Sequence, residues 1–377
     1  MFPAAGRYGW VAKWLGGDLP QMRLMMTTES ANVRGPRPPL RSPGLPPRLR
    51  RGDRIGIVSP SAPEAGRNPR RLERAVRTLE QMGFVPRLGA SVSKIRDTTA
   101  GTIAERLDDI HTMFADPDIR AVICSIGGSN ANQLVEGLDY RLVAANPKIF
   151  MGFSDITVLL AAIHRFTGLV VMLGPAALPQ FGEIGGLHPF TQSAFETVLM
   201  RSAPTGLLPA SEVSISEFLA WDRDDGRRRR EVAWPGPAVI RVGQASGPII
   251  AGHLPTLLLT AGTPAWPDFD GAILCLELAD TDRAADLSRH LFHLRQCGVM
   301  QRIAGMTLGR MHSATGLHSL DHIASIVGIA AEGHDFPIAC NFDFGHTDPM
   351  FILPWGVMAT LVCDDRASLR LDGPAVS

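Results

Sequence analysis

The feature that most constrains this sequence is an alternation of short apolar runs with amphipathic stretches. Residues 55–58 and 121–125 are short, largely apolar runs, as in strands buried on both faces. Between them, Leu72, Ala75 and Leu79 recur at the spacing of one helix face. Strands that alternate with helices form parallel sheets with helices on both faces, so this part of the chain predicts an α/β domain.

The alternation stops and later resumes, which predicts a second, smaller domain. Residues 242–250 are typical of strands, 251–254 of the start of a helix, and 271–278 of a buried strand.

We leave Met25 and Met26 open as alternative starts of the chain. The proposed divisions are a disordered Pro- and Arg-rich leader at 1–50, an N-terminal α/β domain at 51–200, a linker or insertion at 201–239, and a C-terminal α/β domain at 240–372.

Composition excludes several classes of protein. The 37 basic and 37 acidic residues balance, which argues against a nucleic-acid or membrane-surface partner. The apolar runs are far shorter than the ~18 residues that a membrane span needs. Five scattered cysteines without CxxC spacing indicate buried thiols in a reducing compartment, not a disulfide framework or zinc site. We therefore predict a soluble cytoplasmic protein without secretory signal, metal or cofactor.

A serine stands at the centre of the first candidate site. Residues 149–151 predict a buried strand that Gly152 ends, and an apolar helix pattern starts at Ile156. Ser154 therefore lies on the turn between strand and helix, where a hydroxyl can be presented at the edge of a parallel sheet. Because Ser and Asp are also favoured helix caps, this stretch taken alone favours capping over catalysis, and the rest of the chain reverses that order.

Two further polar residues interrupt or follow strands. Glu277 lies inside an apolar run, where a buried carboxylate is costly without a partner, although an exposed strand end would make it ordinary. His346 lies in the loop Asn341-Phe342-Asp343-Phe344-Gly345-His346-Thr347-Asp348-Pro349, and a loop histidine is often only structural. Together with Ser154, these residues provide the nucleophile, base and orienting carboxylate that nucleophilic catalysis requires.

A glycine pair completes this candidate site. Gly127 and Gly128 follow the strand at 121–125 and precede Ser129. Glycines let backbone N–H groups approach a ligand closely, so with the Asp155 N–H they can form an oxyanion hole. A plain tight turn is the alternative.

The insertion contains aromatic and basic residues with two possible roles. Trp221 and Trp234 flank an arginine run at 227–230. The tryptophans either stack on a planar ligand or pin the loop to the core. We interpret the arginine run as a solvated patch, with gripping of an anionic ligand as the weaker alternative.

Several familiar motifs are absent. Residues 152–156 read GFSDI and lack the second glycine of G-x-S-x-G. The sequence has no GxGxxG, P-loop lysine or HExxH. Instead, SIGGSNANQL, GFSD, the strand carrying Glu277, and FGHTDPMFILPWG occur in an order that resembles the serine LD-carboxypeptidase family. The resemblance runs from about residue 50 to 371 and is strongest to the branch that includes the microcin C immunity proteins.

This resemblance implies a parallel-sheet N-terminal domain, a smaller swivelling C-terminal domain and a homodimer. It implies a metal-independent triad of Ser154, Glu277 and His346, with Gly128 and Asp155 donating to the oxyanion. Gly127, Ser129, His253, Trp221 and Trp234 are further candidates for substrate contacts. The sequence departs from the family at Leu278, where aspartate is frequent, and at His253, which replaces an asparagine.

Two functions remain open at this point. The first is a hydrolase that cleaves an L,D-peptide bond of murein tetrapeptides or the acyl–phosphoramidate bond of an aminoacyl-nucleotide antibiotic. The second is a two-lobed protein that binds a peptide or nucleotide without cleaving it.

Overall fold

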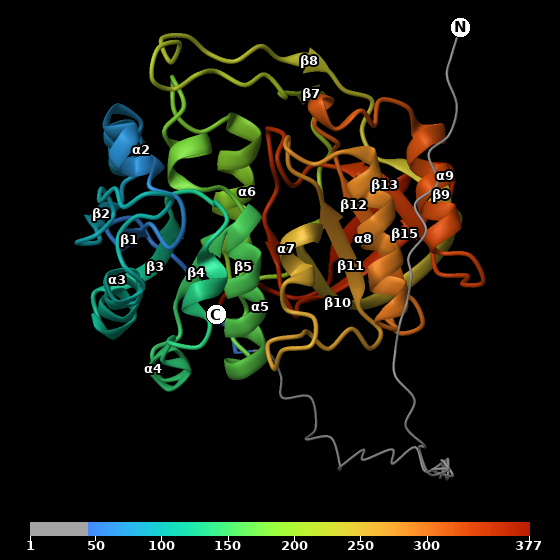
Figure 1. The fold of residues 1–377 in the computed structure, drawn as a ribbon, viewed down its shortest axis with the longest axis horizontal. Coiled ribbons are helices and arrows are strands. Elements are labelled where there is room, and N and C mark those ends of the chain that lie inside the picture. The colour runs from blue at the N-terminus through green and yellow to red at the C-terminus, as the bar shows by residue number, and fades with distance from the viewer. Residues whose placement is uncertain (1–43) are drawn as a thin grey trace, which may run out of the picture. The chain divides into compact units, whose positions relative to one another are not determined.

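The computed structural model describes residues 44–377, and predictions for residues 1–43 lie outside the described part. The first sheet has the strand order β14-β5-β4-β3-β1-β2 (Figure 1). All its strands are parallel except β14. Their bounds are β1 Arg54–Val58, β2 Val85–Leu88, β3 Ile119–Cys124, β4 Ile149–Gly152, β5 Met172–Leu173 and β14 Leu353–Pro354.

The strand order of this sheet decides which helices cover which face. The chain moves outward from β1 to β2, crosses back to β3, and continues to β4 and β5. Right-handed crossovers therefore place α2 on one face and α3, α4 and α5 on the other. In open α/β sheets, ligands bind beyond the carboxyl ends of the strands where the order reverses, which here are β1 and β3. The helices are α1 Glu64–Arg67, α2 Pro69–Gln81, α3 Ile103–Ala115, α4 Tyr140–Ala145, α5 Thr157–Thr167 and α6 Pro189–Leu199.

Local sequence signals set several of these helix ends. Pro69 starts α2, where its fixed φ suits the first turn. Thr102 caps α3 and accepts a hydrogen bond from the Glu105 N–H, while the Glu105 carboxylate accepts one from the Thr102 N–H.

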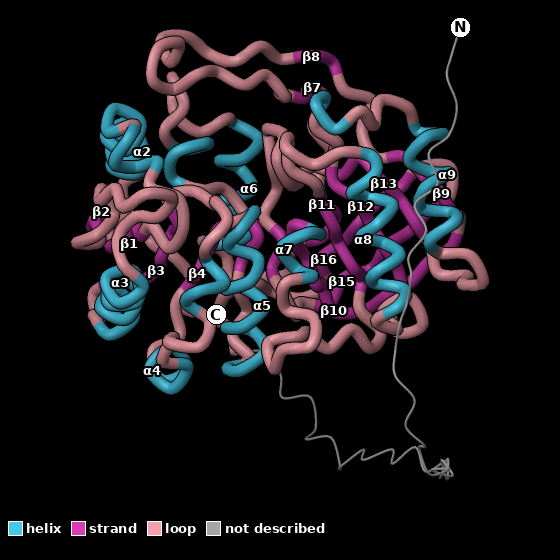
Figure 2. The backbone as a smooth tube through the Cα atoms, viewed as in Figure 1, coloured by secondary structure: helices cyan, strands magenta, loops and turns pink. Residues whose placement is uncertain are grey.

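The second sheet is mixed, with the order β6-β16-β15-β10-β11-β12-β13-β9. Its parallel centre, β10 to β13, is flanked by antiparallel strands. Helices α7, α8 and α9 lie side by side along it (Figure 2). The bounds are β6 Gly206–Leu207, β9 Ala238–Arg241, β10 Gly243–His253, α7 Leu254–Leu258, β11 Ile273–Glu277, α8 Ala284–Gln296, β12 Gly305–Gly309, α9 Leu320–Ala330, β13 Ile338–Phe342, β15 Met358–Cys363 and β16 Ala367–Leu371. The two sheets confirm the predicted α/β fold class.

Two expectations about the chain's course need correction. Residues 44–50 do not belong to a disordered leader: the Leu49 N–H donates to Leu199 O, and the Arg48 N–H donates to Ser377 O. The extended, proline-containing segment thus satisfies its backbone groups on folded parts of the chain. The helix predicted to open within 251–254 begins only at Leu254, because β10 runs on to His253 as one strand.

The division at residues 200 and 240 stays a prediction. β14 comes from the predicted C-terminal domain but pairs with β5 in the first sheet, and β6 of the predicted linker pairs with β16 in the second. The rest of that linker includes a hairpin of β7 (Val213–Ser214) and β8 (Val232–Ala233), which we call the 213–233 hairpin. Its loop runs across toward α2 and α6 (Figure 1).

The described residues form a large apolar interior. Cys124, Cys275, Cys340 and Cys363 are buried in strands, as expected, whereas Cys297 is exposed. Between residues 44 and 377, no helix is both long and apolar enough to cross a bilayer.

Candidate active site

Ser154 stands on a strained turn between β4 and α5. A single 3-10 turn, Ser154–Ile156, links the strand to the helix, and Ser154 has a φ of 62°. A non-glycine residue in this region costs about 1–3 kcal/mol, so the surrounding structure must hold it there. Its Oγ lies 2.9 Å from His346 Nε2. The Ser154 hydroxyl is therefore bonded to a histidine. The residue at the cap position of α5 is Ile156, so the interpretation of Ser154 as a helix cap is wrong.

Glu277 and His346 complete a chain of hydrogen bonds with Ser154. Glu277 ends β11 and is 1% exposed, and its Oε2 lies 2.6 Å from His346 Nδ1. Gly345 permits this approach. It has a φ of 99°, and a Cβ there would lie 2.7 Å from the Glu277 Cβ. The strand-borne carboxylate is therefore buried with a partner, which excludes the exposed-end alternative.

The electrostatics of His346 favour its protonated form. Burial alone lowers the pKa of His346, but the Glu277 carboxylate, helped by Asp280 and Asp282, outweighs this and raises the pKa above its ordinary 6.5. An imidazole in this setting can accept a proton from a hydroxyl and remain stable as the cation.

The Asp155 carboxylate holds the glycine loop against Ser154. Its Oδ2 accepts hydrogen bonds from Ser61 Oγ at 2.5 Å and from the N–H groups of Asn130 and Ala131 at 2.8 Å. This oxygen therefore ties together the loops that follow β1, β3 and β4. The sequence suggested only a role for the Asp155 backbone, and the three-way contact depends on strand order.

Of the predicted glycine pair, Gly127 lies directly against Ser154. A Cβ on Gly127 would lie 2.7 Å from the Ser154 Cβ and 3.1 Å from the Asp155 N, so only glycine fits. Gly128 has a φ of 151° and packs against Ser61 and Ala62. Gly128 and Ser129 are exposed, so this edge of the loop is open to a ligand.

His253 also reaches the site. It ends β10 directly opposite Glu277 in the parallel register, and its ring centre lies 5.4 Å from that of His346. Its Nε2 lies 2.7 Å from Asp282 Oδ2, and its Nδ1 lies 2.8 Å from Thr256 Oγ1. Both ring nitrogens therefore already have protein partners.

The two tryptophans face different arginines. Trp221 lies under the guanidinium of Arg71 on α2 at 4.3 Å, which favours the loop-pinning alternative. Trp234 faces Arg310 at 5.9 Å. Stacking of either ring on a ligand stays a prediction.

The interpretation of the arginine run as a solvated patch is wrong for Arg229. Its side chain is only 16% exposed and contacts Glu183 and Asp348, both at 2.5 Å. Arg227, in contrast, is half exposed and pairs with Glu217. The run therefore mixes one largely buried ion-pair residue with surface arginines, a difference that periodicity cannot show.

The loop that carries His346 has a further support that the sequence did not reveal. Arg310, at the end of β12, is fully buried. It donates from Nε to Thr347 Oγ1 at 3.1 Å and forms an ion pair with Asp343 at 2.7 Å. Nothing in the spacing of Arg310 pointed to the histidine loop, since the two meet only because β12 and β13 are neighbouring parallel strands.

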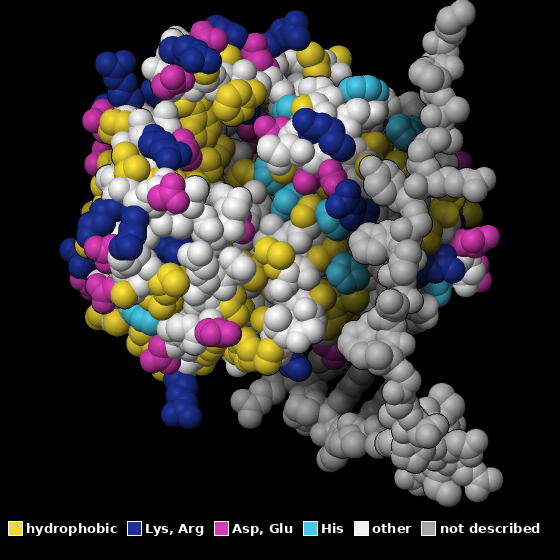
Figure 3. Space-filling model, viewed as in Figure 1, with side chains coloured by type: hydrophobic (Ala, Val, Ile, Leu, Met, Phe, Trp, Pro, Cys, Tyr) yellow, Lys and Arg dark blue, Asp and Glu magenta, His cyan; other side chains and the backbone are white. Residues whose placement is uncertain are grey.

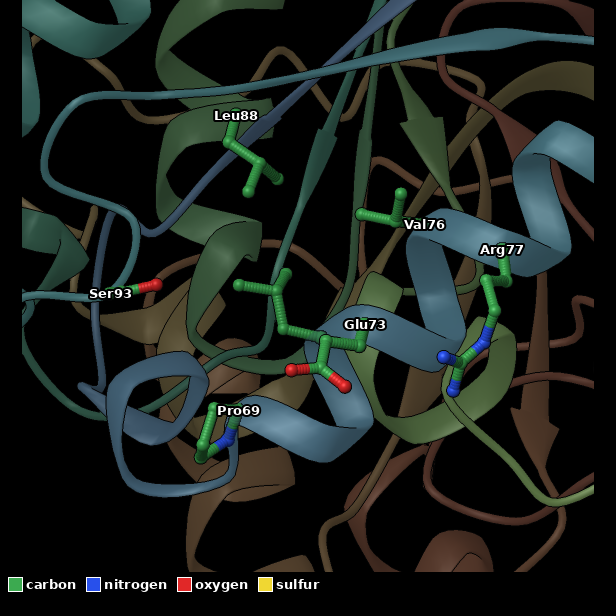
Figure 4. A pocket seen from close by; sticks show the side chains of 7 residues that line it. Pro69, Glu73, Val76, Arg77, Leu88 and Ser93 are labelled. Carbon is green, nitrogen blue, oxygen red and sulfur yellow. The ribbon is translucent and has the colours of Figure 1, made fainter.

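The surface is hollowed near the histidines. Figure 3 shows histidine side chains gathered beside a hollow between the two halves of the molecule. A separate hollow of about 440 Å³ runs along α2, with Leu72, Val76 and Leu88 among its lining (Figure 4). None of the predicted site residues lines this second hollow.

Two family matches cover both halves of the chain. Residues 55–174 match the LD-carboxypeptidase N-terminal domain, and residues 246–361 match the LD-carboxypeptidase C-terminal domain. Among characterised proteins, the microcin C7 self-immunity protein MccF of Escherichia coli is 32% identical, over 84% of this chain and 92% of that protein. The murein tetrapeptide carboxypeptidase of Pseudomonas aeruginosa is 30% identical, over 82% and 92%.

Solved structures agree with these matches. MccF in complex with glutamyl sulfamoyl guanosine superposes with a TM-score of 0.82 at 30% identity, covering 89% of this chain and all of that one. A variant of MccF in complex with adenosine monophosphate gives the same values. An MccF-like protein from Bacillus anthracis has a TM-score of 0.82 at 32% identity.

Proposed function

Because this chain belongs to the LD-carboxypeptidase family of serine-type hydrolases, we propose that it cleaves an amide-type bond with Ser154 as nucleophile. The observation that supports this most directly is the chain of contacts from Ser154 Oγ to His346 Nε2 and from His346 Nδ1 to Glu277 Oε2. No metal takes part in this proposal.

Each member of the triad has a distinct task. His346 takes the proton of Ser154 as the hydroxyl attacks the carbonyl carbon, and later gives it to the leaving nitrogen. Glu277 keeps the Nδ1–H tautomer in place and stabilises the imidazolium. Water then attacks the acyl-enzyme, with His346 again as base, and frees Ser154.

The developing oxyanion needs donors on the side away from His346. We assign this role to the N–H groups of Gly128 and Asp155. The position of Gly127 against Ser154 and Asp155 N supports it, because a side chain there would block the space in which the oxyanion forms.

Two substrate classes fit the proposed chemistry. One is the L,D-peptide bond of a murein tetrapeptide, as the name of the Pseudomonas relative suggests. The other is the acyl–phosphoramidate bond of a microcin C-like aminoacyl nucleotide, in line with the nucleotide ligands in the MccF structures. The expected homodimer and cytoplasmic location stay predictions.

Replacing Ser154 by alanine tests the proposal. We expect turnover of the accepted substrate to fall about 10⁴-fold or more, because residues of a triad act as a unit. Both substrate classes are offered to the purified protein, and the products are identified by mass spectrometry. Near wild-type turnover in Ser154→Ala would remove the nucleophile from this role.

A fluorophosphonate probe separates hydrolase from binding protein. Attack by Ser154 forms an Oγ–P bond, the P–F bond breaks, fluoride leaves, and His346 takes the proton. We expect the intact wild-type protein to gain the mass of one phosphonyl group, at Ser154. Stoichiometric ligand binding without product or labelling would favour the non-catalytic alternative.

A further inference from the structure

The 213–233 hairpin contacts the loop that carries His346. The N–H of Ile215 donates to Asp348 O at 2.6 Å, and the Asp348 N–H donates to Ile215 O at 3.0 Å. From the other arm of the hairpin, Arg229 Nη2 contacts Asp348 Oδ2 at 2.5 Å. Asp348 lies two residues after His346 and is 5% exposed. The hairpin therefore grips the histidine loop by both backbone and side chain.

The first half of the molecule contacts the same arginine. Arg229 Nε donates to Glu183 Oε2 at 2.5 Å, and Glu183 lies just after the turn Ala177–Phe181. Gln180, from that turn, donates to the other carboxylate oxygen of Asp348 at 3.2 Å. One guanidinium thus bridges a carboxylate of the first half to a carboxylate of the histidine loop.

The end of the hairpin is itself anchored on α2. Asp225 accepts from Arg71 at 2.9 Å and forms an ion pair with Arg74, while Arg71 Nη2 also lies 3.3 Å from Glu183. Arg71 is 1% exposed, so this is a buried network and not a surface pair. Buried networks of this kind hold one arrangement, because breaking one partner leaves an uncompensated charge.

We propose that Arg229 is a positioning residue, which sets the His346 imidazole on Ser154 by fixing Asp348 against Glu183 and the 213–233 hairpin. This inference rests on the proposed hydrolase and adds a residue outside the triad to it. The guanidinium is suited to the task because its planar fork reaches two carboxylates at once, which an ammonium cannot do in the same geometry.

The proposal predicts a specific kinetic defect. In Arg229→Gln, Asp348 loses its ion pair with Arg229, so the histidine loop is held less tightly. Since small displacements of reacting groups are costly, the rate constant for fluorophosphonate labelling of Ser154 is expected to fall ~10-fold or more. The pH midpoint of the labelling rate constant is expected to equal the wild-type value, because the His346–Glu277 pair is intact. Arg229→Lys, which keeps one charge, is expected to restore part of the rate.

Arg227→Gln is the matched control. Arg227 lies two residues away in the same arginine run, but its partner Glu217 belongs to the hairpin itself. We expect its labelling rate constant to stay within ~2-fold of the wild-type value, as for ordinary surface substitutions.

The outcomes separate this inference from the proposed function. No labelling at Ser154 in the wild-type protein overturns the hydrolase. Labelling of the wild-type protein with an equal rate constant in Arg229→Gln overturns only the role of Arg229. An equal fall in both arginine variants, or a lower labelled fraction with an unchanged rate constant, shows a general folding effect and also overturns it.

Discussion

At the scale of single residues, the site depends on polar groups that are costly to bury. Glu277 Oε2 binds His346, whereas its Oε1 is buried with no hydrogen-bond partner among residues 44–377. A carboxylate half satisfied in this way stabilises a positive charge on its neighbour more strongly than one that is solvated. The high pKa of His346 is thus a direct consequence of where β11 ends.

Replacing Glu277 by glutamine tests this coupling. The base works when neutral, so turnover falls as pH drops through the pKa of His346, which Glu277 raises in the wild-type protein. Without the carboxylate that pKa falls, and the acid limb of kcat/KM is expected to move to lower pH. The maximum kcat is expected to drop about 10³-fold or more, since the tautomer is no longer held.

The measurement is the pH dependence of kcat/KM for whichever substrate is accepted. The exposed Glu80 on α2 supplies the control, since Glu80→Gln should leave both the limb and the maximum in place. An acid limb that stays at the wild-type pH in Glu277→Gln would contradict the assignment of Glu277 as the carboxylate that raises the pKa of His346.

At the scale of elements, the end of β10 docks on the first turn of α5. The His253 N–H donates to Thr157 Oγ1 at 3.0 Å, and a Cβ on Gly252 would overlap the Thr157 side chain. Thr157 lies three residues after Ser154, and His253 pairs with Glu277 in register. This strand–helix contact therefore sets the distance between nucleophile and orienting carboxylate.

The substitution Gly252→Ala is expected to force β10 and α5 apart. Overpacking of a close contact costs about 1–3 kcal/mol, so the free energy of unfolding in urea should fall by that amount, together with activity. Gly328→Ala in the interior of α9 is the opposite case, because a Cβ there meets open space. It should stabilise the protein by about 1 kcal/mol through helix propensity. Equal effects of the two substitutions would contradict this packing argument.

At the scale of the whole described molecule, the two sheets are joined at several points. The Trp355 N–H donates to Val171 O beside the first sheet, and the next N–H, of Gly356, donates to Ile249 O in β10. Trp355 is fully buried. At the C-terminal end, the Ser377 N–H donates to Pro46 O. Unfolding of either sheet would therefore break hydrogen bonds that also hold the other sheet in place.

We therefore expect the halves to unfold together. Chains of this size often unfold in steps, domain by domain. Here, tryptophan fluorescence and far-UV circular dichroism should report one coincident transition in urea. Two separated transitions would show that the shared strand β14 and the C-terminal contacts contribute little to coupling.

Much of the fold could be predicted because its signals are local. The buried run before Gly152, the helix period after Ile156 and the apolar run ending at Glu277 each depend on neighbouring residues, and β4, α5 and β11 appear where they were expected. The strand character of 251–253 was missed because the helix that begins at Leu254 was expected to start at Ala251.

The sequence by itself determined the kinds of element and the polar residues that end the strands. Only the tertiary structure decided that the partners of His346 lie 69 and 192 residues away and that the Asp155 carboxylate joins three loops. It also decided that the Arg229 side chain is largely enclosed while that of Arg227 is half exposed. The physical reason is range. Backbone periodicity reports burial within one element, but which side chains meet depends on strand order and on the crossovers between strands.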